Sequence, residues 1–275
     1  MARIESPITK TSPQNMAFQW LLEDPAFNDY TEERIVQRFA LATLFYSSSG
    51  GGGSNLASSG EGWFNDENWL SYQHECEWWA REDSGQYADN DRTILQYDAP
   101  GGPCGDEGQE GVYQHLWLWG NRLQGTLPLE LYLLAPLRSI ALTSNQLGGT
   151  LSTHIGKLSH LEALALQGNS LTGPLPDQLY SLTNLTGLFL FNNNFDGTIS
   201  ADLSNLSLLK YLLLDDNSFN GSIPKGLDAL QNLEWLYLDK NDFTGTIPTD
   251  IFAAVNQTIT PKLELVNFAE NLLTG

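Results

Sequence analysis

The chain has 275 residues, with 13 Lys or Arg and 33 Asp or Glu, so its formal net charge is −20. This acidic balance, without a basic patch, argues against a nucleic-acid partner, and a hydrophobic fraction of 41% argues against a disordered chain. The longest near-continuous apolar run, Phe39 to Tyr46, is far too short for a membrane span, so none is expected within this chain.

Two helices are expected near the start of the chain. Before them there is no basic-then-apolar leader, so either the sequence begins downstream of a targeting segment or it is read without one. Ser12 followed by Pro13 is typical of a capped helix start, and Pro25 ends that helix. Thr31 is the candidate cap of the second helix, because the acidic residues after it suit the positive end of a helix dipole. The apolar residues expected on one face are Met16, Ala17, Trp20 and Leu21 in the first helix, and Ile35, Phe39, Ala42 and Tyr46 in the second.

Residues 47–62 are rich in glycine and serine and predict a flexible loop. Residues 63–79 are rich in tryptophan and can bury much apolar area in a small module. Cys76 and Cys104 are the only cysteines, and they could form a disulfide, remain thiols or join a metal site. We favour the disulfide, because a zinc site usually needs four close ligands. Such a bond implies an oxidising compartment.

Residues 82–110 hold eight acidic residues and one basic residue. They could ligate calcium, but they lack an Asp-x-Asp-x-Asp-Gly loop with a distal Glu, so we expect a solvated acidic loop and no metal site. The four histidines are scattered: His74, His115, His154 and His160. No Ser-His-Asp or Cys-His grouping is readable. The sequence therefore predicts no catalytic residue, no cofactor and no enzyme activity.

From residue 114 onward, a repeat of 24 residues governs the sequence. Each copy places two apolar residues five and three positions before an Asn, and a Gly four positions after it. The repeated residues are Asn121, Asn145, Asn169, Asn193, Asn217 and Asn241, and Asn271 belongs to a seventh copy that arrives 30 residues later. One coil cannot bury its own apolar face but stacked coils can, so the pattern predicts a solenoid with a curved parallel sheet. We expect the Asn amides to satisfy the backbone of neighbouring coils rather than to act functionally.

Residues 164–185, LALQGNSLTGPLPDQLYSLTNL, resemble the plant-type leucine-rich repeat LxLxxNxLxGxIPxxLxxLxxL. Residues 212–233 and 236–251 match the same pattern. Ser152 and Ser200 stand where other copies have Pro, which is expected to cost some turn rigidity but not the fold. The resemblance implies an α/β solenoid, a right-handed leucine-rich-repeat superhelix with a parallel concave sheet.

Residues 19–27, 37–47 and 68–79 resemble the N-terminal cap of plant-type leucine-rich-repeat ectodomains, and more closely the cap of cell-surface leucine-rich-repeat proteins of diatoms. The resemblance implies a helical, disulfide-linked cap over residues 1–113, followed by seven repeats over residues 114–275. The last repeat is truncated within its turn, so we expect a fragment of a longer protein.

The residues beside and between the two leucines of each strand point outward and need not be apolar. These positions nevertheless hold Trp117, Trp119, Phe189, Phe191, Tyr211, Leu213, Trp235 and Tyr237, with Asp215, Asp216 and Asp239 beside them. A contiguous aromatic patch usually marks an interaction surface, so we predict a ligand-binding site on the concave face. The alternative is that the aromatic residues pack laterally on one another and that a cap loop folds over the first two tryptophans. The acidic residues favour a partner with basic groups.

Four Asn-x-Ser/Thr patterns predict glycosylation off the strands if the chain is secreted: Asn184, Asn205, Asn220 and Asn256. A column of threonines belongs to the repeated turn rather than to an ice-binding surface. By resemblance, the chain is the extracellular or cell-surface part of a receptor-like or adhesion protein that binds a protein, peptide or glycan. The alternative is a secreted inhibitor of a cell-wall-degrading enzyme, like the polygalacturonase-inhibiting proteins.

Overall fold

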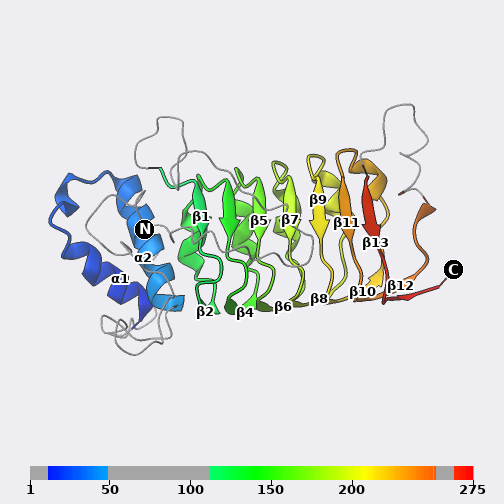
Figure 1. The fold of residues 1–275 in the computed structure, drawn as a ribbon. Coiled ribbons are helices and arrows are strands. Elements are labelled where there is room, and N and C mark those ends of the chain that lie inside the picture. Colours follow the sequence, from blue (N-terminus) through cyan, green and yellow to red (C-terminus); the bar gives the residue numbers. More distant parts are fainter. Residues whose placement is uncertain (1–11, 49–111, 250, 252–262, 275) are drawn as a thin grey trace.

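The computed structural model describes residues 12–48, 112–249, 251 and 263–274, and it has two helices at one end of an elongated stack of coils (Figure 1). The predicted α/β solenoid with a parallel sheet is confirmed, because strands from successive coils lie side by side along the stack. The predictions that lie outside the described residues are the Cys76–Cys104 disulfide, the segments 63–79 and 82–110, nearly all of the loop 47–62, and Asn256.

The strand that begins each coil contributes to the first sheet. Its strands are β1 (His115–Trp117), β3 (Ser139–Ala141), β5 (Ala163–Ala165), β7 (Gly187–Phe189), β9 (Tyr211–Leu213), β11 (Trp235–Tyr237) and β13 (Leu265–Asn267). All are parallel, and their central residues are aligned, from Leu116 beside Ile140 at one end to Leu236 beside Val266 at the other. Because side chains alternate along a strand, these central residues face the core and their neighbours point outward.

A second parallel sheet, which the sequence analysis did not predict, runs along the lower edge of the coils in the view of Figure 1. Its strands are β2 (Gln124–Thr126), β4 (Gln146–Thr150), β6 (Ser170–Gly173), β8 (Asn194–Gly197), β10 (Ser218–Ser222), β12 (Asp242–Gly245) and β14 (Leu272–Leu273). The repeated Gly and Thr fit together here. Gly149 has a φ of 77°, and a Cβ on it would lie 2.8 Å from the methyl group of Thr126. The threonine column therefore packs against the glycines of the next coil, which gives it a structural role.

Short 3-10 helices lead the chain from the second sheet to the next coil: η5 (Leu129–Leu133), η6 (Thr153–Lys157), η7 (Asp177–Ser181), η8 (Ala201–Asn205) and η9 (Leu227–Ala229). Ser152 and Ser200 have φ angles of −72° and −68°, against −70° for Pro128 in the equivalent turn. Each Ser side chain also accepts a hydrogen bond from the backbone N–H two residues ahead. These turns keep the conformation of the Pro turns and gain a cap that Pro cannot provide.

The repeated asparagines form one column through the coils, as the sequence predicts. Asn169 is representative: its Oδ1 accepts a hydrogen bond from the Leu147 backbone N–H at 3.0 Å, and its Nδ2 donates to the Leu142 and Leu166 carbonyls, both at 2.9 Å. In the same way, a backbone N–H of the preceding coil donates a hydrogen bond to the Oδ1 of Asn145, Asn193, Asn217, Asn241 and Asn271. Each asparagine therefore joins two coils and satisfies buried backbone groups of both.

The two helices, α1 (Pro13–Leu22) and α2 (Glu32–Ser48), are separated by the short η1 (Phe27–Asp29). They pack against each other, and α2 also packs against η5 and β2 of the first coil. Both predicted caps are present, because the hydroxyl groups of Ser12 and Thr31 accept hydrogen bonds from backbone N–H groups three residues ahead.

The predicted apolar face of α2 packs against the core, but residues outside that stripe are more deeply buried. Of the four residues expected there, only Ala42 is fully buried, while Ile35, Phe39 and Tyr46 are half-buried. Arg38 instead lies within the buried face. A pattern of apolar residues cannot reveal such a position, because a buried arginine depends on a counter-ion from another part of the chain.

Candidate functional site

The outward residues of the first sheet lie in three rows that cross the coils, on the face predicted to be concave. We call this surface the outer face. The first row is His115, Ser139, Ala163, Gly187, Tyr211, Trp235 and Leu265, and the second is Trp117, Ala141, Ala165, Phe189, Leu213, Tyr237 and Asn267. The third row is Trp119, Thr143, Gln167, Phe191, Asp215, Asp239 and Ala269. From Thr143 onward, the backbone carbonyl of each residue in this row accepts a hydrogen bond from a backbone N–H of the preceding coil. All the predicted ligand-binding residues except Asp216 belong to these rows, and Asp216 directly follows the third.

Most of the predicted aromatic residues meet in one hydrophobic cluster on this face. Phe189 and Leu213 form its buried centre together with two alanines, and Trp117, Phe191, Tyr211, Trp235 and Tyr237 pack around it. The Phe189 and Tyr211 rings stack with centroids 6.1 Å apart, and Tyr211 meets Trp235 edge to face at 5.9 Å. Such contacts between neighbouring coils hold the rings in fixed orientations.

The prediction that the site residues are exposed was wrong for Phe189 and Leu213, and also for Asp215 and Asp239, which are 4% and 6% exposed. Phe189 and Leu213 are each only 3% exposed. The physical reason is lateral packing, the alternative that the sequence left open: residues one coil apart are close enough for large side chains to cover one another. Trp119, in contrast, is 38% exposed. The outer face thus combines a packed aromatic centre with a partly exposed margin.

Gly187 explains how the ring of Phe189 reaches its position. A Cβ on Gly187 would overlap this ring, which therefore lies directly over the glycine. Because Gly187 has no side chain, it leaves the space that the Phe189 ring occupies. The sequence shows Gly187 at an outward position, but only the structure shows what fills the space above it.

A polar group at the first coils was missed by the sequence prediction. Trp117 Nε1–H donates to Ser139 Oγ at 2.9 Å, and Ser139 Oγ lies 2.8 Å from His115 Nδ1. Ser139 Oγ thus accepts a hydrogen bond from Trp117 and also contacts His115, where the direction of the hydrogen bond depends on the tautomer of the imidazole. Burial lowers the pKa of His115 below its ordinary value, an effect that Glu162 opposes and Arg138 reinforces.

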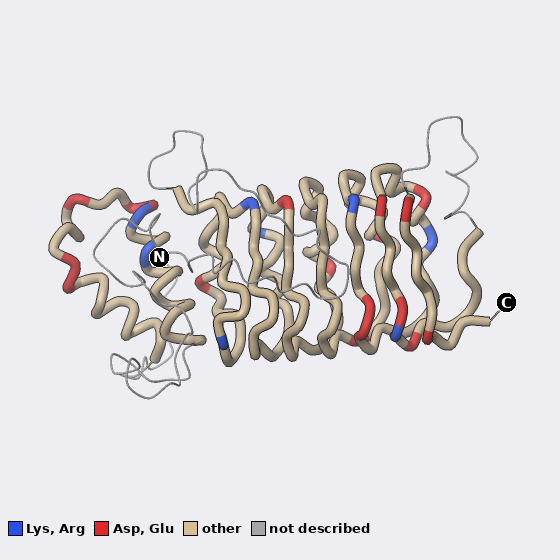
Figure 2. Tube along the Cα trace, in the orientation of Figure 1, with Lys and Arg blue, Asp and Glu red and all other residues tan. Residues whose placement is uncertain are grey.

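Acidic residues gather at the last coils of the outer face (Figure 2). Asp215 and Asp239 are 4% and 6% exposed, whereas Asp216 is exposed and has a φ of 54°. On the same face, Tyr211 OH donates to Glu234 Oε2 at 2.9 Å. Burial and this hydrogen bond both raise the pKa of Tyr211. This end of the face therefore gathers acidic side chains, and Tyr211 keeps its phenol proton.

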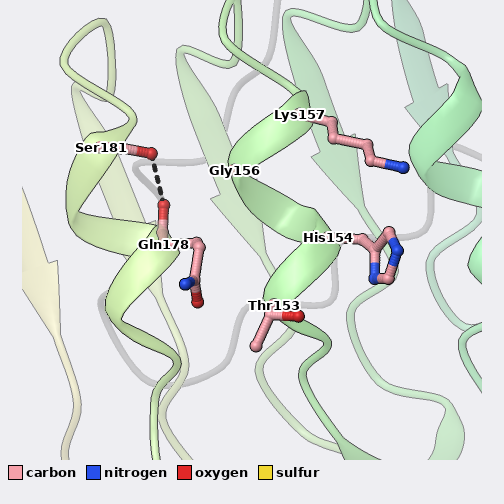
Figure 3. Close-up of a pocket in the computed structure, with 6 residues that line it drawn as sticks. All are labelled: Thr153, His154, Gly156, Lys157, Gln178 and Ser181. Atoms are coloured by element: carbon pink, nitrogen blue, oxygen red, sulfur yellow. Dashed lines mark hydrogen bonds between the residues drawn. The ribbon is translucent and has the colours of Figure 1, made fainter.

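The cleft between η6 and η7 lies away from the outer face (Figure 3). Among its lining residues, His154 and Lys157 point away from Gln178 (Figure 3). The cleft arises because the two coils approach closely at Gly156, where a Cβ would lie 2.9 Å from the Gln178 Cβ. It brings together no acid–base pair. Across the described ranges, no group of three or more His, Cys, Asp or Glu residues could hold a metal ion.

Three of the predicted glycosylation sites lie in the described residues, and each is exposed. Asn184 Nδ2 donates to the Ser159 carbonyl of the preceding coil at 2.8 Å. Asn205 is the last residue of η8. Asn220 was expected off the strands, but it lies within β10, because the second sheet was not predicted.

Comparison with known proteins agrees with this geometry. The Leucine Rich Repeat family matches residues 160–182, 208–230 and 232–253. A crystal structure of a Pollen Receptor Kinase 3 is 31% identical, with a TM-score of 0.54, and the match covers 63% of this chain and 84% of that one. This chain belongs to the leucine-rich repeat family. Curated protein sequences gave no match to this leucine-rich repeat protein.

Two ectodomains of Arabidopsis thaliana receptor kinases are also similar to this leucine-rich repeat protein. That of GASSHO1/SCHENGEN3, in complex with CASPARIAN STRIP INTEGRITY FACTOR 2, is 32% identical with a TM-score of 0.55 and covers 58% of this chain. That of HAESA, in complex with an N-terminally extended IDA peptide hormone ligand, is 32% identical with a TM-score of 0.51 and covers 55%. The present chain spans only 19% and 25% of their respective lengths.

Within the part of the chain that the structure describes, no helix has the length and apolar character needed to cross a membrane.

Proposed function

We propose that this leucine-rich repeat protein is a non-catalytic binding module whose outer face recognises a peptide or protein ligand. The observation that carries the proposal is the hydrophobic cluster around Phe189 and Leu213, which extends over six coils on a sheet face outside the main core. The repeat core closes without these side chains, so the fold alone does not require aromatic residues there. Aromatic residues are enriched among those that dominate binding energies.

The similar structures support a peptide or protein as the ligand class. The HAESA ectodomain is in complex with a peptide hormone, and the GASSHO1/SCHENGEN3 ectodomain with an integrity factor. Both cover more than half of this chain at 32% identity. A glycan partner lacks comparable support, so a peptide or protein is the partner that we propose.

The acidic end of the outer face sets the expected charge of the partner. Asp215, Asp216 and Asp239 lie on neighbouring coils, and the whole chain has a net charge of −20. Potentials across an interface are usually complementary, so a ligand with Lys or Arg side chains is favoured there and an acidic ligand is rejected. Binding is therefore expected to weaken as salt increases.

We further propose that the protein acts outside the cell, as part of a receptor-like or adhesion protein. The exposed acceptor patterns at Asn184, Asn205 and Asn220 support this, as does the similarity to plant receptor kinase ectodomains. Mass spectrometry of protein secreted from a eukaryotic host tests it. Glycan attached to at least one of these residues is expected, and an unmodified secreted protein would count against the proposal.

The binding function is tested with a random library of synthetic octapeptides, measured by fluorescence polarisation against the purified protein. Wild-type protein is expected to bind a subset rich in Lys or Arg, and Phe191→Ala and Tyr237→Ala are expected to lose at least tenfold in affinity. Phe18→Ala is the matched control, because this exposed phenylalanine lies on α1. Equal binding by all the variants would remove the outer face as the site.

A further inference from the structure

Gln167 occupies an unusual position on the outer face. It is only 4% exposed, and its Oε1 has no hydrogen-bond partner. Its backbone carbonyl, in contrast, is fully used, because it accepts hydrogen bonds from Ser144 N–H at 2.9 Å and from Asn169 Nδ2 at 3.4 Å. The fold therefore uses the main-chain carbonyl of Gln167 and leaves the side-chain Oε1 without a partner.

A buried acceptor without a donor destabilises the folded protein, because it has lost water and gained nothing in return. Within the described ranges, the other buried glutamine is satisfied: Gln37 is 8% exposed, and its Oε1 accepts a hydrogen bond from the Tyr113 backbone N–H at 2.8 Å. The corresponding positions of neighbouring coils hold Thr143 and Phe191, so the repeat itself does not demand an amide here. Packing and folding do not account for Gln167.

We propose that Gln167 is a specificity-determining residue of the outer face, and that its Oε1 accepts a hydrogen bond from a backbone N–H of an extended peptide ligand. This inference rests on the proposed function. A neutral donor is favoured over a cation, because Gln167 is itself neutral and its third-row neighbour on the next coil is the aromatic Phe191. The carboxylates that would select a cation begin one coil further on, at Asp215.

The third row also defines the length and polarity of such a peptide. From Trp119 to Asp239 it crosses five coil spacings, about 24 Å at the usual distance between strands. An extended chain covers this distance with about seven residues. The peptide would place a Lys or Arg side chain near Asp215, Asp216 and Asp239, and an apolar side chain near Trp119. Its central amide would then lie over Gln167.

The enclosed position of Oε1 requires a movement on binding. A peptide reaches this atom only when the Gln167 side chain rotates outward, and glutamine has three rotatable bonds for this purpose. Thr143 and Phe191, on either side in the row, are only half-buried, so the positions next to Gln167 reach the surface. The free protein thus holds the acceptor away from water, and a suitable donor replaces an unsatisfied contact with a hydrogen bond.

The test uses the tightest-binding octapeptide from the library screen and a set of its derivatives, each N-methylated at one backbone amide. Gln167→Leu removes the acceptor, and Gln178→Leu, at an exposed glutamine of η7, is the matched control. We expect Gln167→Leu to weaken binding about tenfold, an amount typical of one lost hydrogen bond at an interface, and Gln178→Leu to have no effect. One central N-methylation should weaken wild-type binding equally and should have no further effect on Gln167→Leu.

The outcomes separate this inference from the proposed function. Binding that Phe191→Ala weakens and Gln167→Leu leaves unchanged would overturn the role of Gln167 and retain the outer face as the site. Wild-type protein that binds no octapeptide would overturn both. Thermal unfolding shows whether each variant is folded, and Gln167→Leu is expected to unfold at or above the wild-type temperature, because it removes an unsatisfied buried oxygen.

Discussion

The side chain of Asn169 reaches into the preceding coil, where its Oδ1 accepts a hydrogen bond from the Leu147 backbone N–H at 3.0 Å. Replacement of Asn169 by Leu leaves this N–H without its partner, while the carbonyls of Leu142 and Leu166 keep hydrogen bonds from Asn145 and Asn193. We expect the free energy of unfolding to fall by about 3 kcal/mol, since each buried polar group left alone costs about 1–3 kcal/mol. Urea unfolding measures the change. Asn194→Leu, at an exposed position of β8, is the control, and equal stability of the two variants would contradict the role of the column.

A second, shorter column suggests a stabilising substitution. His160, Asn184 and Asn232 each contact the carbonyl group of the residue 25 positions earlier, in the preceding coil. Leu208 occupies the equivalent position and is 46% exposed. Leu208→Asn should donate to the Thr183 carbonyl and stabilise the protein by about 0.5–1 kcal/mol, the usual net worth of a hydrogen bond. A lower unfolding temperature would show that the column does not extend through this coil.

The helical pair contains a buried ion pair. Arg38 Nη2 lies 3.1 Å from Asp24 Oδ2, and both side chains are fully buried. Arg38→Ala should destabilise the protein by about 3–5 kcal/mol, because the Asp24 carboxylate would be left buried without its counter-ion. The double variant Asp24→Leu/Arg38→Met should recover much of this loss, since it removes both charges. Chemical denaturation measures both, with Glu33→Ala as the exposed control. A single variant as stable as wild type would refute the pairing.

Gly187 offers a direct test of the recess under Phe189. Gly187→Ala adds a Cβ where the ring lies, so the ring must move, and we expect a loss of about 1–3 kcal/mol from overpacking. Octapeptide binding should weaken at the same time. Gly148→Ala is the control, because a Cβ there would lie 3.6 Å from the Ser170 carbonyl oxygen, an ordinary van der Waals contact. Unchanged stability and binding in Gly187→Ala would show that the ring has another position of equal energy.

His115 should make stability depend on pH. Burial lowers the pKa of His115 in the folded protein, so the unfolded chain, with a pKa of about 6.5, binds the proton more strongly. The contribution of His115 is therefore present above about pH 6.5 and is lost as the pH falls towards the folded-state value. Urea unfolding at pH 7.5 and pH 5 should show a larger loss for wild type than for His115→Gln. An NMR titration that gives His115 an ordinary or raised pKa would contradict the prediction.

The solenoid could be predicted because each copy repeats the same apolar residues and the same Asn. The second sheet could not, since its strands contain Gly, Asn and Asp, which are depleted from strands, and they pair only when coils stack. Arg38 was missed for a related reason: its burial depends on Asp24, which lies on another segment.

The outer face was predicted in composition but not in packing. Alternation along the strands places Phe189 and Leu213 outward, whereas their burial depends on the side chains of neighbouring coils. The contact of Ser139 with His115 and Trp117, and the unsatisfied oxygen of Gln167, likewise appear only in three dimensions. No spacing in the sequence distinguishes Gln167 from any other outward residue.

The most direct test of the central claim, that the outer face is the binding surface, is photo-crosslinking. The tightest-binding octapeptide is synthesised with a photoreactive group, irradiated with wild-type protein, and its attachment sites are mapped by mass spectrometry. Attachment to residues of the three rows between β1 and β13 is the predicted result. Attachment confined to the second sheet or to the 3-10 helices would contradict it.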